Sequence, residues 1–361
     1  MLGGSGRLPN TNGWHAIREE SAIGPPRDPA PGRHSTPGGR IWQPRFVGGV
    51  AAIVAVLAGL SGCAAPTAEP PTAPASEDAA TRSETLAAQM PTERNTSAQG
   101  PVSKVLVVVE ENHAASAVLQ EMPYLAGLAD QFGQTSDYRA ITHPSLPNYL
   151  AIAGGSTFGV TDDGPPGNHP ISEISVFDQA IAAGRTARTY AEAMPRPCAP
   201  TAEGRYAVKH NPWAYFSAAA SASNCQQFDV PAGTPDQGAL HNDVLAGELP
   251  TIGLLIPDLC NDGHDCSLQV ADDWLHQWLP FVMQGADYRS GRLAIVVTFD
   301  EDDGTAGNVV LTTVIAPSLS HTVVSTPLTH YSLTRFLAEL AGVAPLGEAA
   351  TSASLASAFH I

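Results

Sequence analysis

The stretch of residues 142–150, Thr-His-Pro-Ser-Leu-Pro-Asn-Tyr-Leu, carries the side chains best suited to nucleophilic chemistry. Ser145 has the position of a helix N-cap, because its hydroxyl can accept a backbone N–H of the first turn, where Pro147 is tolerated. Ser145 would then lie at the positive end of a helix dipole, which stabilises an alkoxide or a bound phosphate. Taken alone, the stretch is explained equally well by an ordinary capped helix.

Further acidic, amide and imidazole side chains follow three apolar runs, at residues 105–109, 251–257 and 293–299. This set of oxygen and nitrogen ligands contains no thiolate, so it suits a divalent cation such as Mg²⁺, Mn²⁺, Ca²⁺, Fe²⁺ or Zn²⁺ better than a soft metal. The candidates are Glu111, Asn112, His264, Asp265, Asp300 and Glu301 at the ends of the runs, and His143, Ser145, His210 and His330 elsewhere.

Each candidate also has a purely structural explanation. Glu111 could be a solvated turn residue, Asp300 part of an acidic loop, and His210 a core histidine beside Trp213. Three acidic clusters after three separate apolar runs are harder to explain in this way. Carboxylates gathered at one edge of a sheet repel one another unless a cation is present. The sequence therefore predicts a divalent metal ion as cofactor, without fixing its identity.

Strands and helices alternate along residues 101–361, which predicts one α/β domain with a mostly parallel central sheet covered on both faces. Sites in such sheets lie at the carboxyl ends of the strands, which is where the polar clusters occur. The remaining expected elements are helices over residues 114–132, 176–183, 272–283 and 332–341, and strands over 186–190 and 309–316.

The charge of the chain narrows its binding partners. The formal net charge is −17, and the 361 residues include just two lysines, Lys104 and Lys209. This argues against nucleic acid as a partner, because nucleic-acid binding requires a basic surface. An anionic substrate would require a local source of positive charge, such as a bound cation.

The first hundred residues read as an export and tethering region. Residues 1–45 are rich in Gly, Pro and Arg and are expected to be a disordered n-region, unless the assigned start lies too far upstream. Residues 46–63 combine an apolar h-region with Leu-Ser-Gly-Cys, which resembles a bacterial lipobox whose Cys63 would be diacylated. A plain signal peptide followed by an unrelated cysteine is the alternative.

Residues 64–100 have no hydrophobic periodicity and are expected to be a flexible linker. The expected localisation is therefore export, with a lipid anchor on the outer face of the bacterial cell membrane and partial secretion as a variant.

Apart from Cys63, the chain has four cysteines. An even number in an exported protein favours two disulfides, and three connectivities are possible. The most local pairing, Cys198–Cys225 with Cys260–Cys266, is our prediction. No C-x-x-C spacing supports a thiolate metal site instead.

The element Ser145-Leu146-Pro147-Asn148 resembles the Ser/Thr-x-Pro-Asn nucleophile element of the alkaline-phosphatase superfamily. A wider set of motifs is similar to the phosphoesterase family of acid phosphatases and phospholipases C, especially secreted acid phosphatases of the mycobacterial type that act on phosphatidylinositol 3-phosphate. These motifs span residues 104 to about 342, in the family's order, at 107–112, 142–149, 209–213, 261–265 and 297–304.

The resemblance implies a three-layer α/β/α sandwich, alkaline-phosphatase-like, that hydrolyses phosphoric monoesters through a phosphoenzyme on Ser145. Glu111 and Asp300, with Glu301 beside it, would hold the metal, and Asn112 would contact metal and phosphate. His264 and His210 would bind phosphate or protonate the leaving group, which favours activity at acidic pH. We further expect Asp265 as a metal ligand and His143, Asn148 and His330 as substrate-binding residues.

Cys266 departs from the family pattern, since close relatives carry Gly there, and the lipobox is a second difference that leaves the substrate open. The expected partners are a small phosphorylated substrate or a phospholipid head group, and the membrane through the anchor. The protein is expected to be a monomer. Two alternative functions remain, a phospholipase C-like phosphodiesterase and a non-catalytic surface-binding lipoprotein. The presence of both Ser145 and Asp300 favours an enzyme.

Overall fold

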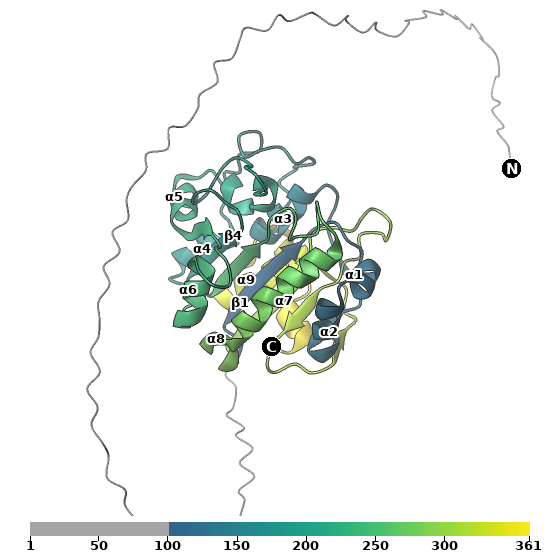
Figure 1. Ribbon diagram of the computed structural model, residues 1–361. Helices are drawn as coiled ribbons and strands as arrows, with labels where there is room; N and C mark the ends of the chain where they lie inside the picture. The colour runs from purple at the N-terminus through teal and green to yellow at the C-terminus, as the bar shows by residue number, and fades with distance from the viewer. Residues whose placement is uncertain (1–100) are drawn as a thin grey trace, which may run out of the picture. The chain divides into compact units, whose positions relative to one another are not determined.

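The computed structural model describes residues 101–361 (Figure 1). The expectations for residues 1–45, 46–63 and 64–100, including acylation of Cys63, lie outside this part of the chain. Among residues 101–361, no helix is both long enough and apolar enough to cross a bilayer.

The centre of the fold is an eight-stranded sheet with the order β5-β4-β6-β1-β7-β8-β2-β9. Neighbouring strands pair in parallel, except that β8 runs antiparallel to both β7 and β2. The strands are β1 (Lys104–Glu110), β2 (Gly133–Thr135), β4 (Ala187–Ala191), β5 (Asp229–Pro231), β6 (Ile252–Ile256), β7 (Leu293–Phe299), β8 (Thr313–Ile315) and β9 (Thr322–Val324). Two further strands, β3 (Tyr138–Arg139) and β10 (Leu328–Thr329), form a small separate parallel pair.

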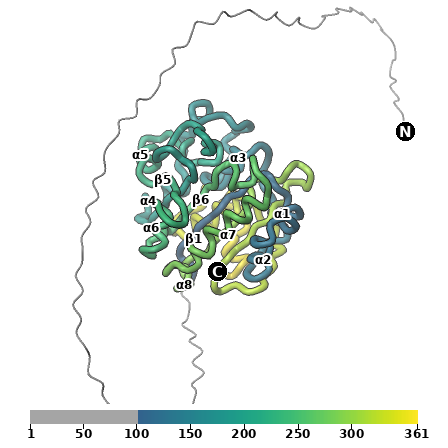
Figure 2. Tube along the Cα trace, viewed as in Figure 1, coloured from purple at the N-terminus to yellow at the C-terminus, as the bar shows by residue number. Residues whose placement is uncertain are grey.

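The strand β1 occupies the middle of the sheet because its β-branched side chains can be buried on both faces. Val107 is paired with Leu254 of β6 on one side and with Val296 of β7 on the other. All three strands run in the same direction, so their carboxyl ends lie at the same edge of the sheet. Figure 2 shows β1 and β6 close together in the tube trace.

Two groups of helices cover the sheet, which confirms the expected three-layer, mostly parallel α/β architecture. In one group α1 (Ala115–Glu121) and α2 (Pro123–Gln131) pack against α7 (Leu268–Gln284), which runs alongside β1 in Figure 1. In the other, α3 (Ser145–Gly154) and α4 (Val176–Ala182) pack against α9 (His330–Ala341). The remaining helices are α5 (Ala219–Phe228), α6 (Ala239–Ala246), α8 (Ala286–Arg289), α10 (Leu355–Phe359) and the 3₁₀ turns Val208–His210, Pro212–Tyr215 and Gly347–Ala350.

Two expected elements differ from the structure. The helix expected over residues 114–132 is broken into α1 and α2 at Met122, which has a non-helical backbone. Pro123 causes the break, because a proline disfavours helical backbone at the preceding residue and begins the next helix well. The strand expected over residues 309–316 is reduced to the three residues of β8, and it is antiparallel.

The two expected disulfides are confirmed. Cys198 is bonded to Cys225 of α5, with 5.4 Å between their Cα atoms. Cys260 is bonded to Cys266 and closes the loop that follows β6, with 4.7 Å between the Cα atoms. This second bond fixes the loop that carries His264.

Candidate active site

Ser145 is the first residue of α3, and Pro144 is the N-cap residue, one position earlier than expected. The Ser145 hydroxyl makes no capping bond. It donates to Glu111 Oε2 at 3.0 Å instead. The first turn is capped from outside the helix, because the Leu146 N–H donates to Asp163 Oδ1 at 3.0 Å. The hydroxyl of Ser145 is therefore free to face the carboxyl end of β1.

Glu111 and Asp300 come together because they follow two adjacent parallel strands whose last residues, Glu110 and Phe299, are paired. Both side chains are fully buried. Asp300 Oδ1 accepts the N–H of Asn112 at 3.0 Å and that of Glu301 at 2.7 Å. The other oxygen, Asp300 Oδ2, has no hydrogen-bond partner, and neither does Asn112 Oδ1, whereas Glu111 Oε1 lies 3.0 Å from His210 Nε2. Two buried oxygens thus lack donors at this edge of the sheet.

The two carboxylates have opposite electrostatic environments. Burial raises the pKa of Glu111, but the charge of His210 outweighs burial and lowers this pKa to about 2. Burial and the nearby charge of Glu111 raise the pKa of Asp300 well above its usual range. A second negative charge beside Glu111 therefore requires a cation to balance it.

The site fits a divalent cation held by Glu111, Asn112 and Asp300, because carboxylate and amide oxygens are hard ligands and two of these oxygens have no donor. Within residues 101–361, one group of three His, Cys, Asp or Glu ligand atoms lies within 4.8 Å of one another, and it consists of Cys198, Cys225 and Asp229. Its two sulfurs form a disulfide, so this group does not offer thiolate ligands to a metal.

The other two expected metal ligands have different contacts. Glu301 Oε2 accepts from Asn148 Nδ2 at 3.1 Å, and burial and the charge of Glu111 raise the pKa of Glu301 to about 8. Asp265 has a side chain that is 59% exposed, and its carboxylate contacts His264 Nδ1 at 2.8 Å. Glu301 thus lies beside the candidate cation site, whereas Asp265 orients His264.

The two expected catalytic histidines have different environments. His210 is 1% exposed, and its ring nitrogens lie 3.0 Å from Glu111 Oε1 and 3.2 Å from Asp262 Oδ2. Burial lowers its pKa, but these two acids outweigh burial and raise the pKa to about 9, so the ring is an imidazolium held between carboxylates. His264 is 29% exposed and has Nε2 3.3 Å from Lys209 Nζ. His264 is therefore the imidazole accessible to a leaving group.

The three residues expected to bind substrate have mainly internal partners. His330 is fully buried, with Nε2 2.6 Å from the Asp300 carbonyl oxygen and Nδ1 3.1 Å from the Tyr138 hydroxyl. Asn148 accepts the N–H groups of residues 141 and 142 and donates to Glu301. His143 Nε2 contacts Asp302 Oδ1 at 3.0 Å, but its side chain is 44% exposed. His330 and Asn148 thus position the site, and His143 alone of the three faces solvent.

Two residues of the site were not singled out from the sequence. Lys209 Nζ lies 3.3 Å from Ser145 Oγ, and Asp163 contacts both Lys209 and the first turn of α3. Two signals pointed to Lys209, since it is one of two lysines in the chain and it begins the motif at residues 209–213. Asp163 lies in a Gly- and Pro-rich loop with no helical or strand pattern.

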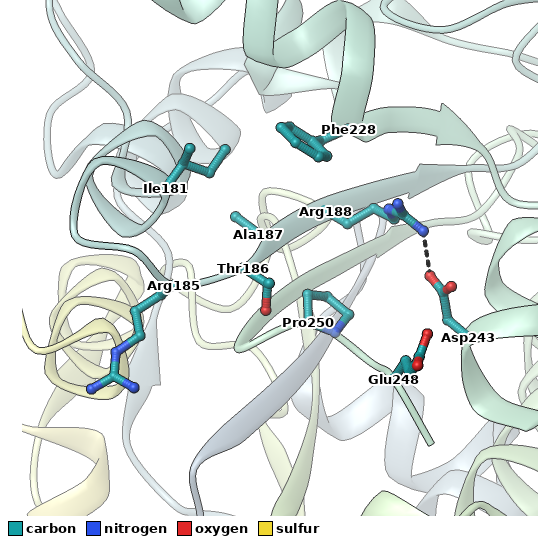
Figure 3. A pocket seen from close by; sticks show the side chains of 9 residues that line it. All are labelled: Ile181, Arg185, Thr186, Ala187, Arg188, Phe228, Asp243, Glu248 and Pro250. Atoms are coloured by element: carbon teal, nitrogen blue, oxygen red, sulfur yellow. Dashed lines mark hydrogen bonds and ion pairs between the residues drawn. The ribbon is translucent and has the colours of Figure 1, made fainter. Parts of the chain in front are cut away.

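A cavity of about 200 Å³ lies at the opposite edge of the sheet (Figure 3). It is lined by residues that precede or begin β4 and β6, such as Thr186, Ala187 and Pro250. Arg188 and Asp243 form an ion pair at one side of it. None of the expected site residues lines this cavity.

Comparison with known proteins gives a consistent assignment. The phosphoesterase family matches residues 115–344. A phosphatidylinositol-3-phosphatase of Mycobacterium tuberculosis is 30% identical over 68% of this chain and 79% of its own length. A probable acid phosphatase of Kluyveromyces lactis is also 30% identical, over 58% of this chain. The chain spans about half the length of that yeast relative, 51% of it.

One solved structure shares the fold at low sequence identity. A lipoteichoic acid synthase from Listeria monocytogenes superposes with a TM-score of 0.50 at 8% identity, over 70% of this chain and 77% of that one. A protein in the alkaline phosphatase superfamily from Vibrio parahaemolyticus gives a TM-score of 0.49 at 12% identity, over 70% of each chain. The relatives named phosphatases indicate a hydrolase that acts on phosphate esters. The extent of the family match shows that this chain belongs to the phosphoesterase family.

Proposed function

We propose that the protein is a metal-dependent phosphoric monoester hydrolase of the acid phosphatase type, with Ser145 as its nucleophile. The observation that carries this proposal is the bond from the Ser145 hydroxyl to Glu111 Oε2, beside two buried oxygens without donors, Asp300 Oδ2 and Asn112 Oδ1. Phosphoinositides are candidate substrates, because a relative that is 30% identical is a phosphatidylinositol-3-phosphatase.

The binding step would depend on charge balance. A divalent cation held by Glu111, Asn112 and Asp300 would neutralise phosphate oxygens and lower the pKa of the serine hydroxyl. Glu111 Oε2 accepts the hydrogen bond of Ser145 and so orients a lone pair of Oγ toward the incoming phosphorus. The imidazolium of His210, between Glu111 and Asp262, keeps Glu111 ionised for this role.

The chemical step would transfer the phosphoryl group to the serine. The Oγ–P bond forms as the bond from phosphorus to the leaving oxygen breaks, and the hydroxyl proton of Ser145 passes to Glu111 Oε2. His264, with Nδ1 held by Asp265, would donate a proton from Nε2 to the departing alkoxide once the Lys209 ammonium, which contacts Nε2 here, has moved to the phosphate. Water then cleaves the phosphoserine and releases inorganic phosphate.

Hydrolysis of p-nitrophenyl phosphate by the full-length protein, with and without a chelator, tests this function. We expect activity that the chelator abolishes and that Ser145→Ala lowers by several orders of magnitude, with the fold intact. A well-folded Ser145→Ala protein with near-wild-type activity would contradict the proposal. Faster hydrolysis of bis(p-nitrophenyl) phosphate than of the monoester would favour the phosphodiesterase instead.

The role of His264 has its own test. His264→Ala should lower the rate with alkyl phosphates by about 10²-fold or more, and the rate with p-nitrophenyl phosphate far less, because nitrophenolate leaves without protonation. Asp265→Asn keeps the size of the side chain that contacts His264 Nδ1 but removes its charge. It should also slow alkyl phosphates more than p-nitrophenyl phosphate, by a smaller factor. Equal loss on both substrates would assign His264 to phosphate binding rather than proton donation.

We also propose that the protein is exported and anchored by acylation of Cys63. The motif ending at Cys63 supports this, and so do the two disulfides, because such bonds persist in oxidising compartments. Cys63→Ser should release the protein from the membrane fraction or leave it unprocessed. Wild-type protein that is wholly soluble, with no acyl mass on its N-terminal peptide, would refute the anchor.

A further inference from the structure

Two hydrogen-bond donors lie beside the proposed nucleophile. The first is the Leu146 N–H at the start of α3, a ten-residue helix whose N-terminus attracts anions. The second is the Lys209 ammonium, 3.3 Å from Ser145 Oγ. A backbone amide and an ammonium next to a nucleophilic oxygen are the groups that would bind the oxygens of a phosphoryl group on it.

Both donors already have an anionic partner. Asp163 Oδ1 accepts the Leu146 N–H at 3.0 Å, and Asp163 Oδ2 accepts from Lys209 Nζ at 3.1 Å. The carboxylate comes from the loop between α3 and α4, and its side chain is 31% exposed. One carboxylate thus bridges the two donors.

A separate observation indicates that a ligand belongs next to these donors. Ser145 donates to the fully buried Glu111, and Asp300 Oδ2, which is buried beside Glu111, has no hydrogen-bond partner. The site therefore has unsatisfied acceptors on the Glu111 side of Ser145 and donors taken by a carboxylate on the Lys209 side.

We propose that Asp163 is a displaceable carboxylate that occupies the oxyanion subsite made by the Leu146 amide and Lys209, and that phosphate must displace it. This inference rests on the proposed function and adds a residue that sets how tightly phosphate binds. Asp163 and a phosphate dianion cannot share the same two donors, because like charges in contact repel. Displacement of Asp163 opposes binding and favours release of the phosphate product.

The alternative role for Asp163 is to hold Lys209 in place. Two other contacts of Lys209 make this role unnecessary. Its ammonium also lies 3.3 Å from His264 Nε2 and 3.3 Å from Ser145 Oγ. The carboxylate of Asp163 contacts both donors directly, so removal of its charge should help an anion to bind them.

The test is the affinity for inorganic phosphate, measured by isothermal titration calorimetry on the full-length protein in magnesium-containing buffer. Asp163→Asn should tighten phosphate binding by about five- to tenfold, since a neutral amide competes less well for the ammonium. Lys209→Met should weaken binding by about tenfold or more. In the double variant, the gain from Asp163→Asn should largely disappear, because both changes act on one pair of contacts.

Asp162→Asn is the matched control. It removes the same charge one residue away, from a carboxylate that contacts His169 and the Gly164 N–H instead of the site. It should change the phosphate affinity less than twofold. Asp163→Ala should reproduce the gain seen with Asp163→Asn, which excludes an effect of the new amide.

Weaker or unchanged phosphate binding in both Asp163 variants would overturn the inference and make Asp163 a support for Lys209. Absence of measurable phosphate binding in the wild type and in both variants would also overturn it. The measurement does not require turnover, so its failure is distinct from that of the proposed function. If the protein has no phosphatase activity but Asp163→Asn still tightens phosphate binding, the proposed function fails and the proposed subsite stands.

Discussion

Asp178 and Asp300 are both buried aspartates, and their surroundings are opposite. The carboxylate of Asp178 accepts five hydrogen bonds, from the Ser175 N–H and hydroxyl, the Ser221 hydroxyl, Asn224 Nδ2 and Trp213 Nε1. Asp300 accepts two backbone N–H groups on one oxygen, and its other oxygen has none. Asp178 ties α4 to the segment before α5 and to α5 itself, whereas Asp300 lies next to another buried carboxylate, Glu111.

The difference separates two uses of a buried charge. A carboxylate with every lone pair satisfied stabilises the fold, because the donors replace the water that it has lost. A carboxylate with an empty oxygen beside another acid costs stability unless a ligand is bound. The pattern of missing donors, rather than burial itself, indicates where a cation belongs.

Asp300→Asn should have the largest effect, and on function rather than stability. We expect kcat to fall by about three to four orders of magnitude, equivalent to about 4–5 kcal/mol, because the variant loses a ligand of the proposed cation. Bound metal, measured by mass spectrometry after desalting, should fall in parallel. The metal-free variant should unfold at the same temperature as metal-free wild type or higher. A variant that is fully active and still binds metal would contradict the proposed difference between Asp300 and Asp178.

Asp178→Ala should have the next largest effect, on stability alone. It leaves several buried donors without a partner, so the free energy of unfolding should fall by about 4 kcal/mol. Urea denaturation with the disulfides intact measures this change. The folded fraction should keep wild-type kcat, since the side chain does not contact the site. A large loss of kcat with little loss of stability would reverse the assignment of the two aspartates.

Asp229 lies between these two extremes and should have the smallest effect. It is fully buried and accepts from Thr189 Oγ1 and Asn211 Nδ2. Burial raises its pKa to about 7, although both hydrogen bonds act in the opposite direction. Between pH 4 and 7 the folded state therefore binds more protons than the unfolded state, so stability falls as pH rises.

The loss attributable to Asp229 should be roughly 3 kcal/mol across this pH range. The free energy of unfolding, measured by urea denaturation at several pH values, should decline less steeply in Asp229→Asn than in the wild type. Identical pH dependence in the two proteins would show that Asp229 is ionised in the fold, as a fully satisfied carboxylate is.

The main features of the fold could be predicted from the sequence because they depend on local composition. Continuous apolar runs identified β1, β6 and β7, and the alternation of strands and helices along the chain implied parallel pairing. Short strands such as β2 and β9 have three residues each and no apolar pattern, and they form through tertiary pairing. Pro123 could have predicted the break at Met122, but the apolar periodicity on both sides favoured a single helix.

The site could be predicted in part for a similar reason. Glu111 and Asp300 follow strands, and the geometry of a parallel sheet brings such residues together. Lys209 lies in a 3₁₀ turn and Asp163 in a loop, 46 residues apart in the chain. Their contact depends on tertiary packing, which hydrophobic periodicity does not predict. The internal contacts of His330 and Asn148 could not be inferred either, because the sequence reveals residue type but not burial.

The most direct test of the account is to trap the phosphoenzyme. The full-length enzyme is quenched with acid during turnover of a phosphomonoester, and the tryptic peptide of residues 140–185 is analysed by mass spectrometry. The account predicts one added phosphoryl group, located on Ser145 by fragmentation and absent when the substrate is omitted. Active enzyme that accumulates no phosphoryl group on Ser145 under single-turnover conditions, or that carries it on a histidine, would contradict the central claim.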